Sequence, residues 1–204
     1  MRIIKVLSSM VLAMALFSCG ASQPAAGTES YIAPGYQKKK FDKMLVLGTM
    51  KDEVGRKKAE TSLVDLLNRS GYKAGATYTF FNINEIKSRE ELQEKVKTFP
   101  FDAIIVLTYL GTSTTITDNV GVASTTPVVT SWNFFDLYTS PAYDFTYDAQ
   151  AQKAGKVYAS LYTSEKYEKQ WGTIIQLNMS NGVDMAADIL AGNVLGRMKR
   201  DKIL

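Results

Sequence analysis

The chain has 204 residues, 46% of them hydrophobic, and a formal net charge of +4. This length allows one domain with a sizeable core, or at most two small ones. The small charge does not favour nucleic acid as a partner. The sequence has no histidine and a single cysteine, Cys19. These counts exclude a disulfide framework, a zinc finger and a Ser-His-Asp catalytic arrangement, and no cofactor is expected.

Residues 1–18 have the pattern of a bacterial lipoprotein signal peptide. Arg2 and Lys5 precede an apolar run at 6–17, which is too short for a membrane span. The pattern predicts cleavage before Cys19 and attachment of fatty acyl chains such as palmitate to it. Each buried methylene contributes about 0.8 kcal/mol, so several chains give a firm anchor. Gly20, in place of Asp, resembles the sorting pattern of outer-membrane lipoproteins. The alternative is an ordinary secretory signal with an incidental cysteine.

Residues 19–40 are predicted to form the lipidated cysteine and a flexible tether. The stretch is rich in Ala, Ser, Gly, Pro and Gln, which cannot bury a core. The basic triplet Lys38–Lys40 at its end is expected to be solvated, with contact to anionic lipid headgroups as the alternative. The folded domain is then predicted over residues 41–204.

Three strands are predicted in the first half of this domain. Residues 43–50 and 101–109 are unbroken apolar runs, which are typical of strands buried on both faces, and residues 72–81 show a weaker β pattern. Two amphipathic helices separate them. One runs from an N-cap at Asp52 to Arg69, and the other starts at a capping box of Ser88 and Glu91. Right-handed crossovers would place the first and third strands side by side in the sheet.

The second half begins with a long aromatic-rich insert, residues 111–155, in which part of 112–130 is expected to form a strand or hairpin. Alternating patterns at 156–163 and 171–177 then predict an antiparallel hairpin. Asn181 is the predicted cap of a last helix. The expected fold is therefore α/β: a mixed sheet, parallel at first and antiparallel later, packed by three helices.

This element order resembles a loose group of small, mostly uncharacterised bacterial envelope lipoproteins. The shared features are a strand, an Arg56-x-x-x-Glu60 helix, the strand 101–106, a strand with Leu161 and Tyr162, and a Trp171 strand before a closing helix. The first half is similar to the N-terminal domain of TolB and to curli-secretion-type lipoproteins. The resemblance implies an accessory or assembly role facing the periplasm, and it transfers no catalytic residue.

Two candidate sites follow from the pattern. Ligands of open parallel sheets bind beyond the carboxyl ends of the strands, which here predicts a crevice with Lys51, Arg56 and Thr112 positioned for an anion. The alternative, which is favoured, is that Lys51 is solvated and Gly48 only turns the chain. Arg56 and Glu60, one helical turn apart, are expected to form a weak surface ion pair.

The second candidate is the aromatic cluster of the insert. It offers a protein-, glycan- or membrane-facing surface, or else a satellite core, and the buried alternative is favoured. The candidate surface residues are Trp132, Phe134, Phe135, Tyr138 and Tyr143. A carboxylate pair among Asp136, Asp144 and Asp148 would suit a glycan hydrolase, but their spacing does not require it.

The sequence therefore predicts a non-enzymatic lipoprotein of the cell envelope. It is held at the membrane, most simply the outer membrane facing the periplasm, through a lipid anchor on Cys19. It would present a surface to a protein or glycan partner. The alternatives are a carboxylate-dependent glycan hydrolase and a protein that binds a small molecule or an anion.

Overall fold

The computed structural model describes residues 30–50, 52–110, 133–135, 154–165 and 167–204. Within these ranges the chain forms six strands, three α-helices and two short 3-10 helices, labelled η. Their order is β1 (Tyr31–Ile32), β2 (Met44–Gly48), α2 (Glu53–Arg69), β3 (Ala74–Ala76), η2 (Thr77–Thr79), η3 (Ile83–Glu85), α3 (Arg89–Lys97), β4 (Ala103–Tyr109), β5 (Ala154–Thr163), β6 (Lys169–Asn178) and α4 (Val183–Arg200).

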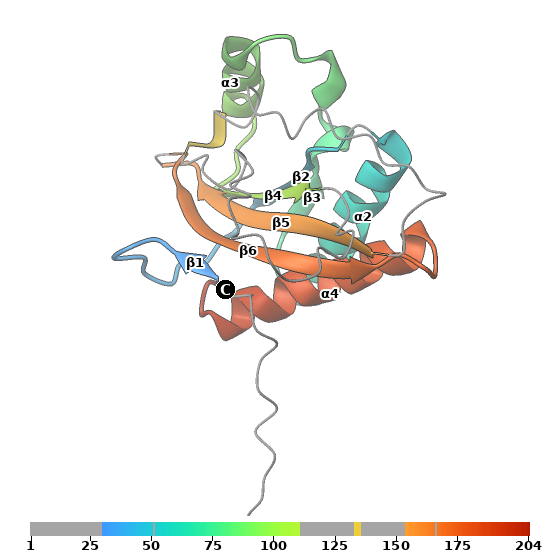
Figure 1. Cartoon of the computed structure of the whole chain (residues 1–204). Helices are drawn as coiled ribbons and strands as arrows, with labels where there is room; N and C mark the ends of the chain where they lie inside the picture. Colours follow the sequence, from blue (N-terminus) through green and yellow to red (C-terminus); the bar gives the residue numbers. More distant parts are fainter. Residues whose placement is uncertain (1–29, 51, 111–132, 136–153, 166) are drawn as a thin grey trace, which may run out of the picture.

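The strands form one mixed sheet in the order β1-β6-β5-β4-β2-β3 (Figure 1). β2 is parallel to both β3 and β4, whereas β4, β5, β6 and β1 pair antiparallel in turn. The β2–β4 register sets Met44 against Ala103 and Gly48 against Leu107. The predicted mixed α/β fold is confirmed, as is the pairing of the first predicted strand with the third.

Helices cover both faces of the sheet. α2 and α4 lie on one side and α3 lies on the other (Figure 1). β4 contributes side chains to the hydrophobic cores on both faces. Ile105 and Leu107 belong to the core under α2 and α4, whereas Ile104 and Val106 belong to the core under α3. Burial on both faces explains why the sequence of this strand is an unbroken apolar run.

Local capping signals start the first two helices as predicted. The Asp52 carboxylate accepts the Gly55 N–H at 2.9 Å, and the Ser88 hydroxyl accepts the Glu91 N–H at 3.1 Å. The prediction that Asn181 caps the last helix is wrong, because the N-cap of α4 is Gly182. Gly182 has φ +87°, a left-handed conformation that glycine adopts without steric cost, so the helix starts one residue later.

Two predicted boundaries also move. The strand expected at 72–81 shortens to β3, since the Thr77 hydroxyl donates to the Val46 carbonyl at 2.7 Å and the chain turns into η2. At the other edge, residues 31–36 of the predicted tether join the domain. Tyr31 pairs with Gly172, and the Tyr36 hydroxyl donates to the Ile203 carbonyl at 3.0 Å.

Candidate functional site

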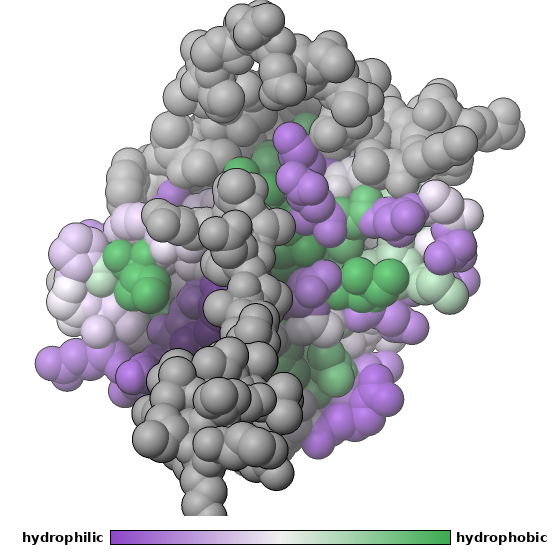
Figure 2. Space-filling view, turned by 60° about the horizontal axis from the view of Figure 1, so that its bottom comes forward, coloured by the Kyte–Doolittle hydropathy of each residue, from purple (hydrophilic) through white to green (hydrophobic). Residues whose placement is uncertain are grey.

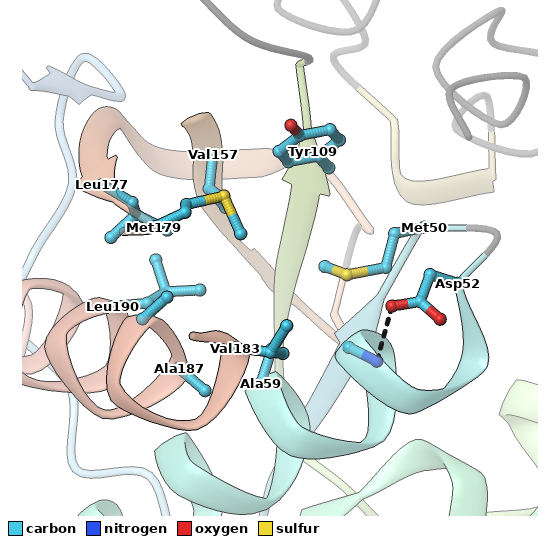
Figure 3. Close-up of a pocket in the computed structure, with 12 residues that line it drawn as sticks. Met50, Asp52, Ala59, Tyr109, Val157, Leu177, Met179, Val183, Ala187 and Leu190 are labelled. Atoms are coloured by element: carbon cyan, nitrogen blue, oxygen red, sulfur yellow. Dashed lines mark hydrogen bonds between the residues drawn. The ribbon is translucent and has the colours of Figure 1, made fainter. Parts of the chain in front are cut away.

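A crevice opens at the edge of the sheet where the parallel strands β2 and β4 end. Its cavity measures about 50 Å³ and lies between the N-terminal ends of α2 and α4 (Figure 3). Met50 extends into it from the chain after β2, Tyr109 from the end of β4 and Met179 from the chain after β6. The anion crevice of the sequence analysis was expected at this edge with Lys51, Arg56 and Thr112, none of which is among the described lining residues.

The walls of this crevice are apolar. Val157, Leu177 and Leu190 line it together with alanines of both helices. Asp52, the one charged residue among the described residues that line the crevice, accepts the Gly55 N–H, the bond drawn in Figure 3. A carboxylate at the N-terminus of α2 also occupies the position where an anion would be stabilised by the helix dipole. The crevice is therefore built to take an apolar group.

A glycine shapes this crevice. A Cβ at Gly155 would lie 2.9 Å from the Met179 sulfur and 3.1 Å from the Tyr109 ring. Its absence lets both side chains lie against the backbone of β5. Met50 and Met179 have flexible thioether side chains, which can adapt to occupants of different shape.

Arg56 and Glu60 do not form the predicted surface pair. Their side chains are 1% and 0% exposed, and Arg56 Nη1 lies 3.5 Å from Glu60 Oε1. Glu60 also accepts the N–H of Gly48 at 2.9 Å and the N–H of Tyr78 at 3.1 Å. Burial raises the pKa of Glu60, and these two N–H groups and the Arg56 guanidinium offset part of the rise.

This buried pair joins α2 to the end of β2 and to η2. The prediction that Arg56 faces an anion in an open crevice is wrong, because its guanidinium is enclosed beside Glu60. Among the described residues, Gly48 is what admits the pair: a Cβ there would lie 2.8 Å from Arg56 Cγ.

The aromatic candidates that the structure describes are core residues. Phe134 and Phe135 are 1% and 4% exposed, so the prediction that they form a partner surface is wrong for these two, and the buried alternative holds. Phe134 packs edge-on against Tyr162, with ring centroids 5.7 Å apart, and Phe135 packs against Tyr167 at 4.7 Å. The other candidate positions lie outside the described residues: Cys19, Lys51, Thr112, Trp132, Tyr138, Tyr143 and the three aspartates Asp136, Asp144 and Asp148.

A buried lysine at the opposite edge of the sheet was not predicted. Lys169 is 3% exposed, and its ammonium lies 5.4 Å from the Tyr31 ring centroid and 5.5 Å from that of Tyr158. Burial lowers the pKa of Lys169 and raises that of Tyr158 to about 12. A register shift between β5 and β6, at Leu161/Tyr162, accompanies this placement, and such bulges re-aim side chains.

The described part of the chain holds no group of His, Cys, Asp and Glu side chains suited to a metal ion. No helix in that part is both long and apolar enough to cross a bilayer.

No family model matches this sequence, and no curated protein does. Among solved structures, the chain is similar to the PelC dodecamer from Paraburkholderia phytofirmans, with 10% identity and a TM-score of 0.44 over 83% of this chain and 96% of that one. A point variant of that dodecamer is 10% identical, with a TM-score of 0.46 over 83% of this chain and 95% of that one. Lipoprotein GNA1162 from Neisseria meningitidis is 16% identical, with a TM-score of 0.39 over 78% of this chain and 96% of that one. TM-scores below 0.5 at these identities establish neither a family nor a function.

Proposed function

We propose that this protein is a non-enzymatic accessory or assembly component of the bacterial cell envelope. It is anchored through acyl chains on Cys19, at the outer membrane facing the periplasm, and its folded domain binds a protein partner. The lipoprotein signal pattern at residues 1–19 supports the anchor. The observation that carries the binding role is the open apolar crevice between α2 and α4.

The chemistry of the crevice favours a protein side chain over a sugar. Hydroxyl groups of a glycan would enter a space whose lining offers them almost no hydrogen-bond partner, and burying an unpaired hydroxyl costs about 1–3 kcal/mol. An apolar side chain gains by leaving water. The occupant is therefore a small apolar anchor, such as the end of a Leu or Met side chain, on a segment of the partner protein.

A crevice-filling substitution tests this proposal. Ala187 is 5% exposed and lines the crevice, so Ala187→Leu places additional methylenes in the space the anchor would occupy. Glu94→Leu is the matched control, because it adds the same side chain on the exposed surface of α3, across the sheet. Both are made in the full-length, membrane-inserted protein carrying a photo-crosslinking amino acid at Val183, beside the crevice.

The expected result is a specific crosslinked partner that disappears in Ala187→Leu and persists in Glu94→Leu. Thermal unfolding checks that both variants fold. If Ala187→Leu is unstable, Met179→Glu sets a charge at the mouth instead. Crosslinking that is unchanged by either crevice variant contradicts the proposed binding site. Mass spectrometry of the mature N-terminus tests the anchor separately, since an unmodified Cys19 would contradict it.

A further inference from the structure

The outward face of α4 carries an exposed apolar stripe. Met185 and Ile189 are 48% and 41% exposed, and Gly192 and Gly196 continue the line at spacings of three and four residues. On an α-helix this spacing places all four on one face. The opposite face of α4, with Leu190 among its residues, is buried against the sheet. Figure 2 views the molecule from the side on which α4 lies, and hydrophobic residues appear there among hydrophilic ones.

Packing within the described part of the chain does not account for the two glycines. Apart from the backbone of α4 itself and the adjacent residues, no atom of the described residues lies within 4 Å of the position a Cβ would take at Gly192 or at Gly196. Alanine would fit at both sites and would favour the helix more than glycine does. Bare backbone on an exposed helix face lets a second helix approach closely, which is how small residues spaced four apart are used in helix pairs.

The stripe is complementary to itself when two copies of α4 run antiparallel. In the register centred between Leu190 and Ala191, Met185 of one copy lies over Gly196 of the other, and Ile189 lies over Gly192. Each large side chain then meets a position without one. In a parallel arrangement, the large side chains of Met185 and Ile189 would instead face their own copies, and a gap would remain between the facing glycines.

The charges on α4 favour the same arrangement. Its first turns carry Asp184 and Asp188, and its last turns carry Arg197, Lys199 and Arg200. The antiparallel register places Asp184 close to Lys199 of the other copy, because successive residues turn by about 100° and both then lie on the same flank of the helix pair. Asp184 already pairs with Lys58 and remains 80% exposed, so it is accessible to a second cation. Parallel helices would oppose like charges at both ends.

We propose that two copies of this protein associate through α4, packed antiparallel about a two-fold axis, with Gly192 and Gly196 at the helix crossing. A contact of this kind is isologous and closes on itself. One helix face buries less than the roughly 800 Å² per partner of a standard interface, so the dimer is weak in solution. Confinement of two anchored copies to one bilayer raises their effective concentration and strengthens it.

The test uses the full-length chain in two forms. Sedimentation velocity over a concentration series uses the Cys19→Ser protein, which needs no lipid. Gly192→Leu and Gly196→Leu, made singly and together, place side chains in open space on the monomer and block the crossing. The expected result is a concentration-dependent dimer of the parent protein, weakened at least tenfold by each substitution. Glu94→Leu, an equal apolar addition on exposed α3, leaves it unchanged.

A charge exchange tests the orientation. Asp184→Lys alone opposes two lysines and weakens the dimer, whereas Asp184→Lys with Lys199→Asp restores it. Crosslinking of the anchored protein in vesicles of phosphatidylethanolamine and phosphatidylglycerol repeats the comparison at high local concentration. A protein that is monomeric in both settings, or a dimer indifferent to the glycine substitutions, overturns the proposal. Ala187→Leu keeps the dimer, so failure of crevice binding and failure of dimerisation are read separately.

Discussion

Replacing Arg56 by Met tests the energetic role of the buried pair under β2. The substitution keeps the length and apolar stem of the side chain and removes only the guanidinium. Removing one member of a buried ion pair costs about 3–5 kcal/mol, because the other charge is left without compensation. Glu60 keeps its bonds to the N–H groups of Gly48 and Tyr78, so we expect the lower end of this range, about 3 kcal/mol, at neutral pH.

The loss of stability in Arg56→Met should depend on pH, and the shift in the pKa of Glu60 determines in which direction. This pKa is raised in the folded protein, so the folded state holds the Glu60 proton more tightly than the unfolded chain does. The protonated side chain therefore favours folding at low pH, and this contribution is lost as the pH rises through the folded pKa. Removing Arg56 takes away an interaction that lowers the pKa, so it rises further. The destabilisation of Arg56→Met should then be smaller in acid than at neutral pH.

Urea unfolding of the wild type and the variant near pH 4.5 and near pH 7.5 measures both quantities. Lys57→Met is the matched control on the same helix. Lys57 pairs with Glu53 at 2.7 Å with the same spacing, but both side chains are about half exposed, so its removal should cost no more than about 0.5 kcal/mol. A loss for Arg56→Met that is equal at the two pH values, or no larger than that of the control, would refute the reasoning.

Three further outcomes follow from the packing. Gly172→Ala should destabilise the domain by about 1–3 kcal/mol, because its Cβ would lie 2.1 Å from the Tyr158 hydroxyl. Gly71→Ala is the comparison in thermal unfolding: its φ of +88° makes alanine strained, but the added Cβ would meet no atom within 4 Å, so it measures backbone strain without crowding. Phe134→Ala should cost about 3–5 kcal/mol in urea unfolding, and a stable variant that has lost only binding would show instead a surface role. Burial tends to raise the pKa of Asp201, but hydrogen bonds from Trp171 and Arg200 outweigh it and leave the pKa lowered. Asp201 therefore stabilises the fold above its unfolded pKa, and this stability is lost as the pH falls through the folded pKa. Asp201→Asn should then make the melting temperature less dependent on pH in the acid range. An unchanged dependence would contradict this role of Asp201.

The features that the sequence predicted correctly are those with local causes. Asp52 and Ser88 cap their helices through atoms three residues away, and the runs in β2 and β4 are apolar because both faces of those strands are covered. The alternation that predicted β5 and β6 reflects a hairpin whose two faces meet different layers. Such signals survive in a single sequence because they do not depend on the rest of the fold.

The wrong predictions concern features that depend on contacts between residues far apart in the sequence. The four-residue spacing of Arg56 and Glu60 is the same for a surface pair and a buried one, and their burial depends on Gly48 and on the N–H of Tyr78. The crevice lies at the predicted edge, but its apolar character comes largely from β5, the chain after β6 and α4, which the pattern of the first half does not contain. The position of Lys169 depends on a register shift that leaves no mark in the residue pattern.

The pairing of β1 with β6 has a mechanical consequence if the protein is anchored through Cys19 as proposed. The segment that leads from Cys19 enters the sheet as an edge strand, with Tyr31 against Gly172 and Ile32 against Trp171. Tension along this segment is therefore transmitted to the backbone of the sheet and not to a loop. The crevice is lined near the far end of β6, at Leu177, roughly 17 Å along the strand from Gly172. In the proposed anchored protein, the load from the anchor and a partner in the crevice would act on the same strand at two separate points.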